Sequence, residues 1–164
     1  MSKKIGADEC FKLCKKVAEK YRYDTYLIYA IVETESNRTY DVISKAGAVG
    51  LMQVTDIARQ DVNQIYGNNF SQSDLFVPEK NIEIGAKFLY RWINHYLKNY
   101  PEYIAVSLGI MTYSWGYGNV QNWLASGEGD NQKITELIPF EKLQYNEDVL
   151  WWYIFAKKYF SEVK

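Results

Sequence analysis

The sequence predicts a mainly α-helical domain, with room for a short β-hairpin around residues 46–52. Apolar residues recur at helical spacing in several segments of the 164-residue chain. Capping residues or prolines stand before several of these segments, and glycines stand after them. A chain of this length forms a single domain with a sizeable core, and 48% hydrophobic residues are typical of a globular protein. We therefore expect one domain over residues 1–164.

The first expected helix spans residues 8–21 and buries one face. That face is formed by Phe11, Cys14, Val17 and Ala18. Cys10 and Cys14 are one helical turn apart, a spacing at which a disulfide within the helix would be geometrically poor. The single histidine, His95, is far away in the sequence, so a metal site would lack ligands. We interpret the two cysteines as small core thiols, and we expect no metal or cofactor.

The second expected helix begins near Tyr26 and ends in two carboxylates, Glu33 and Glu35. One apolar stripe is formed by Leu27, Ile28, Ile31 and Val32. A carboxylate at the end of such a buried helix is costly to ionise, so its pKa should rise, as a general acid at neutral pH requires. The small residues that follow include Gly47 and Gly50, which can adopt positive φ and leave the backbone open to a ligand. This stretch predicts a buried acid beside a ligand-binding loop, although a helix ending in Glu and Ser before a glycine loop is also common in ordinary domains.

Capping and breaking residues mark the next two helices. Thr55 can cap a third helix that ends at Gly67, and a polar loop follows to Val77. Pro78 stands in the first turn of a long helix that keeps its apolar spacing to Leu97.

Four further elements complete the predicted chain. Pro101 opens a helix towards Tyr113, and Gly116 and Gly118 are expected to stop it. A short helix then follows at 120–124, a flexible turn at 127–130 and a final helix from about residue 145 to residue 160.

Four motifs in the chain match a known pattern. Glu35-Ser36 is followed by Ser44 and then by the run Gly47-Ala48-Val49-Gly50-Leu51-Met52-Gln53. Residues 81–89, 113–120 and 138–140 then match three later motifs in the same order. Together the motifs resemble the soluble lytic transglycosylase family, which is related to goose-type lysozyme. The first motif is highly specific, and the match extends from about residue 26 to residue 145.

The resemblance implies a lysozyme-like helical fold and a reaction on peptidoglycan. Enzymes of this family cleave the β-1,4 bond between N-acetylmuramic acid and N-acetylglucosamine and leave 1,6-anhydro-muramoyl ends. Glu35 would protonate the glycosidic oxygen and then act as base on the sugar's own carbon-6 hydroxyl, so no second carboxylate is required. Glu33 is the rival acid, but it lies on a different helical face and does not match the motif position.

The resemblance also implies a set of substrate-binding positions. These are Ser36, Ser44, Gly50, Leu51, Met52, Gln53, Tyr113, Ser114 and Tyr145. Tyr113 would orient Glu35, whereas Ser36 either contacts substrate or caps the helix end. The chain departs from the family at two places. Ser114 stands where the family usually has Asn, and Glu141-Lys142-Leu143-Gln144-Tyr145 stands where the family has a Glu-Thr-Arg triplet before a Tyr.

Charge and hydropathy limit the other partners. The net charge of −1 leaves no nucleic-acid footprint, and no segment is apolar and long enough to insert into a membrane. The basic residues 1–6 precede no apolar stretch, so we expect no signal peptide there, and action at the bacterial cell wall or periplasm by another route or after trimming. We expect a monomer that binds peptidoglycan glycan strands, with some of its 15 Tyr and 5 Trp stacking on sugars.

Two other functions stay open from the sequence. A hydrolase of the same fold would need a water-activating carboxylate such as Asp24, Asp41 or Asp56. A non-catalytic wall-binding module would have no use for the acid at Glu35. A phage endolysin, a secretion or conjugation accessory and a wall-remodelling enzyme would share all of these features, so the sequence does not assign the biological role.

Overall fold

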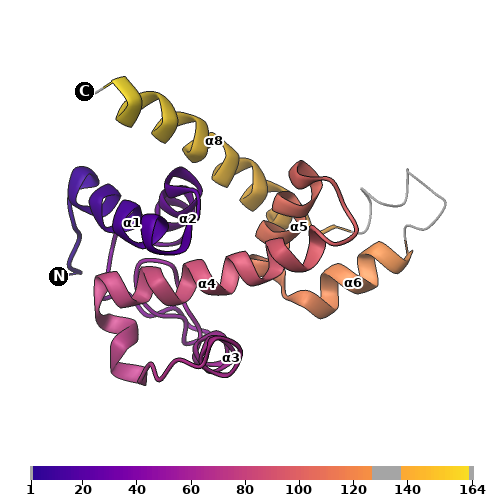
Figure 1. The fold of residues 1–164 in the computed structure, drawn as a ribbon, viewed down its shortest axis with the longest axis horizontal. Coiled ribbons are helices and arrows are strands. Elements are labelled where there is room, and N and C mark those ends of the chain that lie inside the picture. Colours follow the sequence, from indigo (N-terminus) through magenta and orange to yellow (C-terminus); the bar gives the residue numbers. More distant parts are fainter. Residues whose placement is uncertain (1, 127–137, 163–164) are drawn as a thin grey trace. The chain divides into compact units, whose positions relative to one another are not determined.

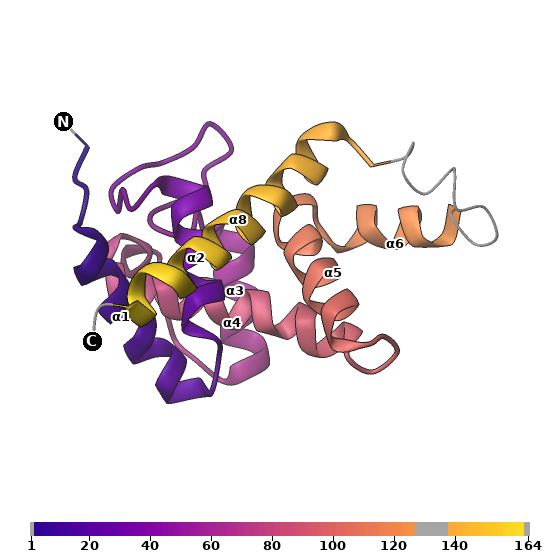
Figure 2. The same ribbon diagram turned by 90° about the horizontal axis from the view of Figure 1, so that it is seen from above.

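The structure, a computed structural model, describes residues 2–126 and 138–162. The chain folds into two compact units, residues 1–88 with 149–164 and residues 89–148. Helices dominate each unit (Figure 1, Figure 2). Within the described ranges, no helix is both long enough and apolar enough to cross a membrane. The mainly α-helical class predicted from the sequence is confirmed, while the assignment of the whole chain to a single domain stays a prediction.

The first unit is built around α2 (Thr25–Ser36). Its other elements are α1 (Ala7–Tyr21), α3 (Asp56–Tyr66), the 3₁₀ helix η1 (Gln72–Phe76), the start of α4 (Pro78–Tyr96) and the end of α8 (Phe140–Glu162). α1 lies beside α2 (Figure 1). The Phe160 ring of α8 stacks on Phe11 of α1 at a centroid distance of 3.8 Å, and its edge meets Tyr29 of α2 at 5.2 Å. α1, α2 and the end of α8 therefore share one aromatic contact region.

The core of the first unit is formed mainly by α2, which is buried over most of its length. Every residue from Leu27 to Glu33 is buried. Cys10 and Cys14 of α1 are fully buried free thiols, as predicted, and burial raises the pKa of the Cys14 thiol. Because the middle of α2 is enclosed on all sides, only the ends of this helix can bring a polar side chain towards solvent.

The second unit contains the end of α4, α5 (Glu102–Trp115), α6 (Tyr117–Ser126) and the start of α8. α4 and α5 approach closely at Gly109, because a Cβ at that position would lie 2.5 Å from Cγ1 of Ile93. The buried hydroxyls of Tyr96 and Thr112 are 2.9 Å apart and link the same two helices. A glycine and one buried hydrogen bond therefore set the contact between α4 and α5.

The helix boundaries set by local capping signals are confirmed. Thr55 caps α3 by accepting the N–H of Ala58 (3.2 Å), and Gly67 ends that helix in a left-handed conformation. Pro78 opens α4, as predicted. α6 is longer than the helix predicted at 120–124, and α8 begins at Phe140 instead of near residue 145. The turn predicted at 127–130 lies outside the described residues.

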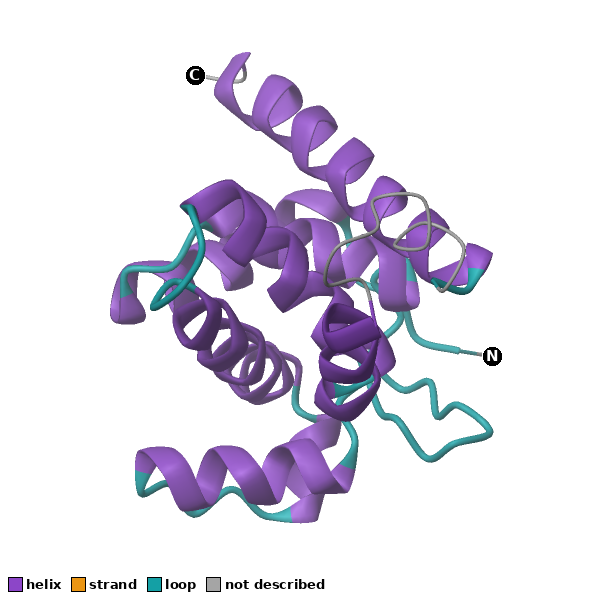
Figure 3. Cartoon of the chain, turned by 90° about the vertical axis from the view of Figure 1, so that its right-hand side faces the viewer, coloured by secondary structure: helices purple, strands orange, loops and turns teal. Residues whose placement is uncertain are grey.

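The hairpin expected around residues 46–52 is present as isolated backbone pairings. Ile43 pairs with Val49, and Val49 pairs with Val54, both in antiparallel orientation. Across residues 2–126 and 138–162 these pairings do not extend into a strand, and loops connect the helices (Figure 3). The segment between α2 and α3 is therefore a series of tight turns.

Candidate active site

The end of α2 carries both candidate acids. Asp24 caps the start of this helix by accepting the N–H groups of Tyr26 (2.7 Å) and Leu27 (3.2 Å). Glu33 is 4% exposed, whereas Glu35, in the last turn, is half-buried. Residues two apart on a helix point roughly 200° away from each other. The two carboxylates therefore point towards different parts of the protein.

The chain reverses direction directly after α2. Asn37 and Arg38 both have left-handed backbone conformations, with φ of 48° and 65°. Residues other than glycine rarely adopt this conformation. The Asn37 N–H closes the helix by donating to the Glu33 carbonyl (3.0 Å). The N-terminal segment also holds this turn, because the Ile5 N–H donates to the Arg38 carbonyl (3.1 Å). The turn is thus fixed just beyond Glu35.

Ser36 links the end of α2 to the glycine loop that follows. Its hydroxyl donates to the carbonyl of Leu51 at 2.8 Å and lies 3.2 Å from the carbonyl of Val32. A hydroxyl has a single proton, so the two carbonyls share it. The Ser36 proton is used within the chain, and a contact between Ser36 and substrate stays a prediction.

Ser44 closes the first turn of the loop. Its N–H donates to the carbonyl of Ala48 (2.8 Å), and its Oγ accepts the Ala48 N–H (3.0 Å). Gly47 completes the turn with φ of 81°, and a Cβ there would meet open space. Ser44 therefore shapes the loop. Its contact with substrate stays a prediction.

Gly50 lies where only glycine fits. Its φ is 78°, and a Cβ there would be 2.5 Å from Nδ2 of Asn81 and 2.9 Å from the carbonyl oxygen of Leu75. The buried Asn81 amide accepts the N–H of Met52 (2.9 Å) and donates to the carbonyls of Val49 and Leu75 (2.8 Å each). One amide therefore fastens the loop to α4, and the missing Cβ of Gly50 allows its approach.

The last three residues of the motif differ in what they can offer a ligand. The side chains of Leu51 and Met52 are 0% exposed, and Met52 packs against Gly85, where a Cβ would be 2.7 Å from the Met52 sulfur. Gln53 has φ of 47°, and its amide donates to the Gly50 carbonyl (3.0 Å). Leu51 and Met52 are enclosed as whole residues, backbone included. Substrate contacts by these two residues, and by Gly50 and Gln53, stay predictions.

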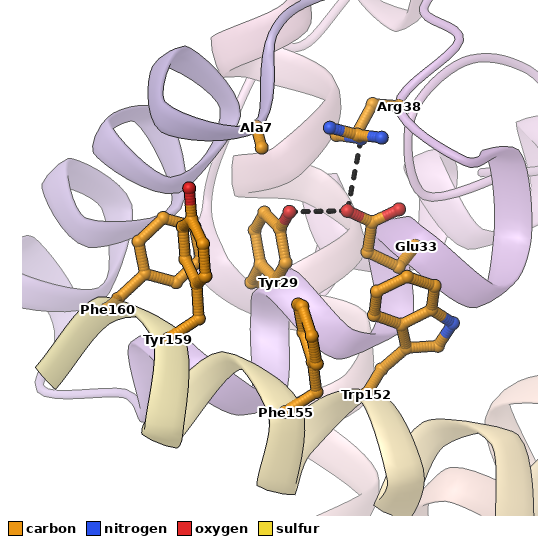
Figure 4. A pocket seen from close by; sticks show the side chains of 8 residues that line it. All are labelled: Ala7, Tyr29, Glu33, Arg38, Trp152, Phe155, Tyr159 and Phe160. Carbon is orange, nitrogen blue, oxygen red and sulfur yellow. Dashed lines mark hydrogen bonds and ion pairs between the residues drawn. The ribbon is translucent and has the colours of Figure 1, made fainter. Parts of the chain in front are cut away.

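Glu33 lines a pocket in the first unit (Figure 4). Its Oε1 accepts the hydroxyl of Tyr29 and lies 3.0 Å from Nε of Arg38. The Glu33 side chain is 1% exposed and that of Arg38 is 19% exposed, so the ion pair is largely buried. Removing one partner of such a pair would leave an uncompensated buried charge. Glu33 is therefore tied to the turn at Arg38, and the choice of Glu35 over Glu33 as the catalytic acid stays a prediction.

Three predicted site residues belong to the second unit. Tyr113 and Ser114 lie near the end of α5, Tyr145 lies on α8, and all three are half-buried. The carbonyl of Ser114 accepts a hydrogen bond from Nζ of Lys142 (2.9 Å). The predicted approach of Tyr113 to Glu35 joins residues of different units. It stays a prediction, as do the substrate contacts of Ser114 and Tyr145.

The three carboxylates considered for water activation are engaged elsewhere. Asp24 caps the start of α2, roughly 17 Å along the helix axis from Glu35 at about 1.5 Å per residue. Asp41 accepts a backbone N–H from the N-terminal segment (2.7 Å). Hydrogen bonds from Arg59 and Gln60 lower the pKa of Asp56, with the Arg59 bond at 2.8 Å. Among the described residues, no three His, Cys, Asp or Glu side chains are grouped as metal ligands would be.

Two residues that shape the site had no role assigned from the sequence. Asn81 belongs to one of the motifs, and a lone amide beside an apolar helical face is a signal that could have identified it as a loop anchor. Arg38 carries no such signal, because its role depends on a left-handed turn and on the buried Glu33.

Comparison with known proteins gives a family and named relatives. The family model described as the transglycosylase SLT domain matches residues 12–135. The membrane-bound lytic murein transglycosylase C of Edwardsiella ictaluri is 34% identical over 132 residues, which are 78% of this chain and 37% of that protein. Its counterpart in Serratia proteamaculans is 36% identical over 118 residues, which are 70% of this chain and 33% of that protein. The chain thus spans about a third of the length of these curated relatives.

Solved structures share the fold. An inactive mutant of the lytic transglycosylase Slt from Pseudomonas aeruginosa has a TM-score of 0.76 and 26% identity, over 92% of this chain and 24% of that chain. The 70 kDa soluble lytic transglycosylase from Escherichia coli also has a TM-score of 0.76 and 26% identity, over 91% of this chain and 24% of that chain. The helical fold that the motifs implied is confirmed.

Proposed function

Because the chain belongs to the transglycosylase SLT family, we propose that it is a peptidoglycan lytic transglycosylase with Glu35 as general acid and base. It would cleave the β-1,4 bond between N-acetylmuramic acid and N-acetylglucosamine and leave 1,6-anhydro-muramoyl ends. The observation that carries this proposal is the Glu35-Ser36 end of α2, which the Ser36 hydroxyl ties to the loop bearing the rest of the motif (2.8 Å).

One carboxyl group is sufficient for both proton transfers. The Glu35 carboxyl donates its proton to the glycosidic oxygen as the bond from that oxygen to the anomeric carbon breaks. The resulting carboxylate then takes the proton of the muramoyl carbon-6 hydroxyl, whose oxygen bonds to the anomeric carbon. Because this hydroxyl belongs to the same sugar, its effective concentration is far above that of water. The acid is regenerated and no external nucleophile is consumed.

The remaining site residues have supporting roles in this proposal. Tyr113 orients the Glu35 carboxyl, and Tyr145 and Ser114 contact the glycan. Gln53 contacts sugar or stem peptide beside the turn that the positive φ values of Gly50 and Gln53, 78° and 47°, shape. The protein acts as a monomer on glycan strands without a nucleic-acid partner, which light scattering and DNA-binding assays would check.

A muramidase that uses water is the second candidate. It would need a carboxylate that activates water opposite Glu35, and Asp24, Asp41 and Asp56 each have other partners. Digestion of purified peptidoglycan followed by mass spectrometry tests the difference. The proposal expects anhydro ends that are lighter by one water than reducing ends. Predominantly reducing muramic acid ends would favour the muramidase, and no soluble product would favour a non-catalytic wall-binding module.

A further inference from the structure

The pocket beside Glu33 has no role in the reaction described above. It lies in the first unit, between α2, the N-terminus of α1 and the end of α8 (Figure 4). Its volume is about 270 Å³, just below the usual range of roughly 300–1,000 Å³ for small-molecule sites. The pocket can therefore take one small group but not an extended glycan.

The floor of the pocket holds polar atoms that have no hydrogen-bond partner among residues 2–126 and 138–162. Glu33 Oε1 accepts the Tyr29 hydroxyl, but no described residue donates to Oε2 of the same carboxylate. Arg38 Nε lies 3.0 Å from Oε1, yet its N–H makes no hydrogen bond to that oxygen or to another acceptor in the described part of the chain. Burial, together with the Glu33 carboxylate, raises the pKa of Tyr29, so its hydroxyl keeps its proton and stays a donor. One acceptor and one donor at the floor thus lack a partner among the described residues, and each atom has less than 1 Å² exposed.

The charges on the floor already balance. Glu33 and Arg38 form an ion pair in which the Glu33 side chain is 1% exposed. A third charge from an ammonium or a carboxylate ligand would enter this site uncompensated, and burying an unpaired charge is strongly unfavourable. The ligand that suits the floor is therefore neutral and presents both a hydrogen-bond donor and an acceptor.

The wall of the pocket limits the class of ligand further. Trp152 and Phe155 project from α8 towards Glu33 (Figure 4), and the Phe155 side chain reaches solvent, since this residue is 41% exposed. Aromatic faces favour an apolar or pyranose surface over a purely hydrated group. A hydroxyl group can donate and accept, but it brings no apolar surface. A secondary amide with an attached methyl group brings all three features.

We propose that this pocket binds a neutral secondary amide, such as the acetamido group of an N-acetyl sugar or the amide of a short peptide. The amide N–H donates to Glu33 Oε2, its carbonyl accepts from Arg38 Nε, and its methyl group packs against Trp152 and Phe155. Both sources of the amide occur in peptidoglycan, but the inference rests on Glu33 and its neighbours and does not depend on Glu35.

Titration with small probes, followed by backbone and indole NMR signals, tests this proposal. The probes are N-acetylglucosamine, N-acetylalanine amide and glucose, none of which contains a glycosidic bond to cleave. The two amides should give saturable shifts at Trp152, Arg38 and Ala7, and glucose should not. If only one of the two amides binds, its identity shows whether the pocket recognises an N-acetyl sugar or a peptide amide. Equal binding of glucose, shifts confined to residues 47–53, or no saturable shift with either amide would overturn the proposal.

Substitutions test whether the amides bind in this pocket. Ala7 lines the mouth of the pocket, so Ala7→Met should fill it and weaken amide binding at least about tenfold, whereas Lys12→Met, at an exposed position of α1, should not. Unchanged binding in Ala7→Met would contradict the proposal. Glu35→Gln should bind the amides as the unaltered chain does. A chain that binds N-acetylglucosamine at Trp152 but fails to cleave peptidoglycan would refute only the proposed function.

Discussion

Glu33 and Glu35 belong to the same helix turn and differ in almost everything else. Glu33 is 4% exposed, lies 3.0 Å from the guanidinium of Arg38 and accepts the hydroxyl of Tyr29. Glu35 is half-buried in the last turn of α2, next to Ser36, whose hydroxyl holds the glycine loop. A rotation of about 100° per residue separates their surroundings. The comparison teaches that helical phase decides what surrounds each of two identical carboxylates.

The same comparison separates a structural role from the proposed catalytic role. A carboxylate enclosed by its own chain and paired with a guanidinium stabilises a turn that would otherwise be strained. A carboxylate at the end of a buried helix, beside a loop of small residues, can reach a ligand. The folding role and the proposed catalytic role should therefore respond differently to substitution.

The largest expected effect on stability is at Glu33. Glu33→Ala leaves Arg38 without its buried partner, so we expect a loss of about 3–5 kcal/mol in the free energy of unfolding. Glu79→Ala is the matched control, because Glu79 pairs with Lys16 at the surface (2.8 Å) and should contribute less than about 1 kcal/mol. Urea denaturation measures both. Equal losses in the two variants would mean that Glu33 does not hold the turn.

The next effect concerns the two glycines of the loop. Gly47 and Gly50 have φ of 81° and 78°, so Ala strains the backbone at both positions. Only Gly50→Ala also meets the Asn81 amide, at 2.5 Å. We expect Gly50→Ala to cost about 1–3 kcal/mol more than Gly47→Ala. Thermal unfolding checks this order, and a reversed order would show that Asn81 does not fasten the loop.

A smaller effect is expected from the hydroxyl that joins α2 to the loop. Ser36→Ala should cost about 1 kcal/mol of stability and should also lower turnover, because the last turn of α2 loses its link to Leu51. Thr34→Ala removes a comparable bond to the Ala30 carbonyl (2.9 Å) that lies within the helix. It should change stability similarly and turnover little. Equal turnover in the two variants would argue against a positioning role for Ser36.

The smallest expected effect is that of a chelator. The one-carboxylate mechanism uses no metal, so EDTA should leave the release of peptidoglycan fragments unchanged. Dye-labelled peptidoglycan gives the rate before and after treatment. A large loss that added divalent cations restore would overturn the mechanism.

Sequence reasoning succeeded where structure is decided locally. Thr55 and Pro78 mark helix starts through their own hydrogen bonding and backbone angle, and both predictions are confirmed. It failed where apolar spacing was absent. The first turn of α8 has only two apolar residues, Leu143 and Phe140, and Phe140 is 75% exposed, so no sustained apolar pattern marked the true start. Gly116 ends α5, as expected, whereas Gly118, expected to stop the same helix, lies inside α6, since a surface helix tolerates one glycine.

The candidate site was predictable in part for the same reason. Helical phase and the motif distinguish Glu35 from Glu33 without any coordinates. The partners of these residues are not local, because Asn81 reaches the loop from α4 and Arg38 reaches Glu33 through a left-handed turn. The pocket wall comes from Trp152 and its neighbours on α8, far along the chain. No sequence pattern links such distant residues.

The most direct test of the division between the two carboxylates compares Glu35→Gln with Glu33→Gln on purified peptidoglycan. The amide is nearly isosteric with the carboxyl group but cannot transfer the required proton, so Glu35→Gln should lower the rate of turbidity loss at least about 100-fold with an unchanged melting curve. Glu33→Gln should lower the melting temperature and leave the rate per folded molecule within about a factor of ten. The opposite pattern, with an active Glu35→Gln and a stable but inactive Glu33→Gln, would contradict the account.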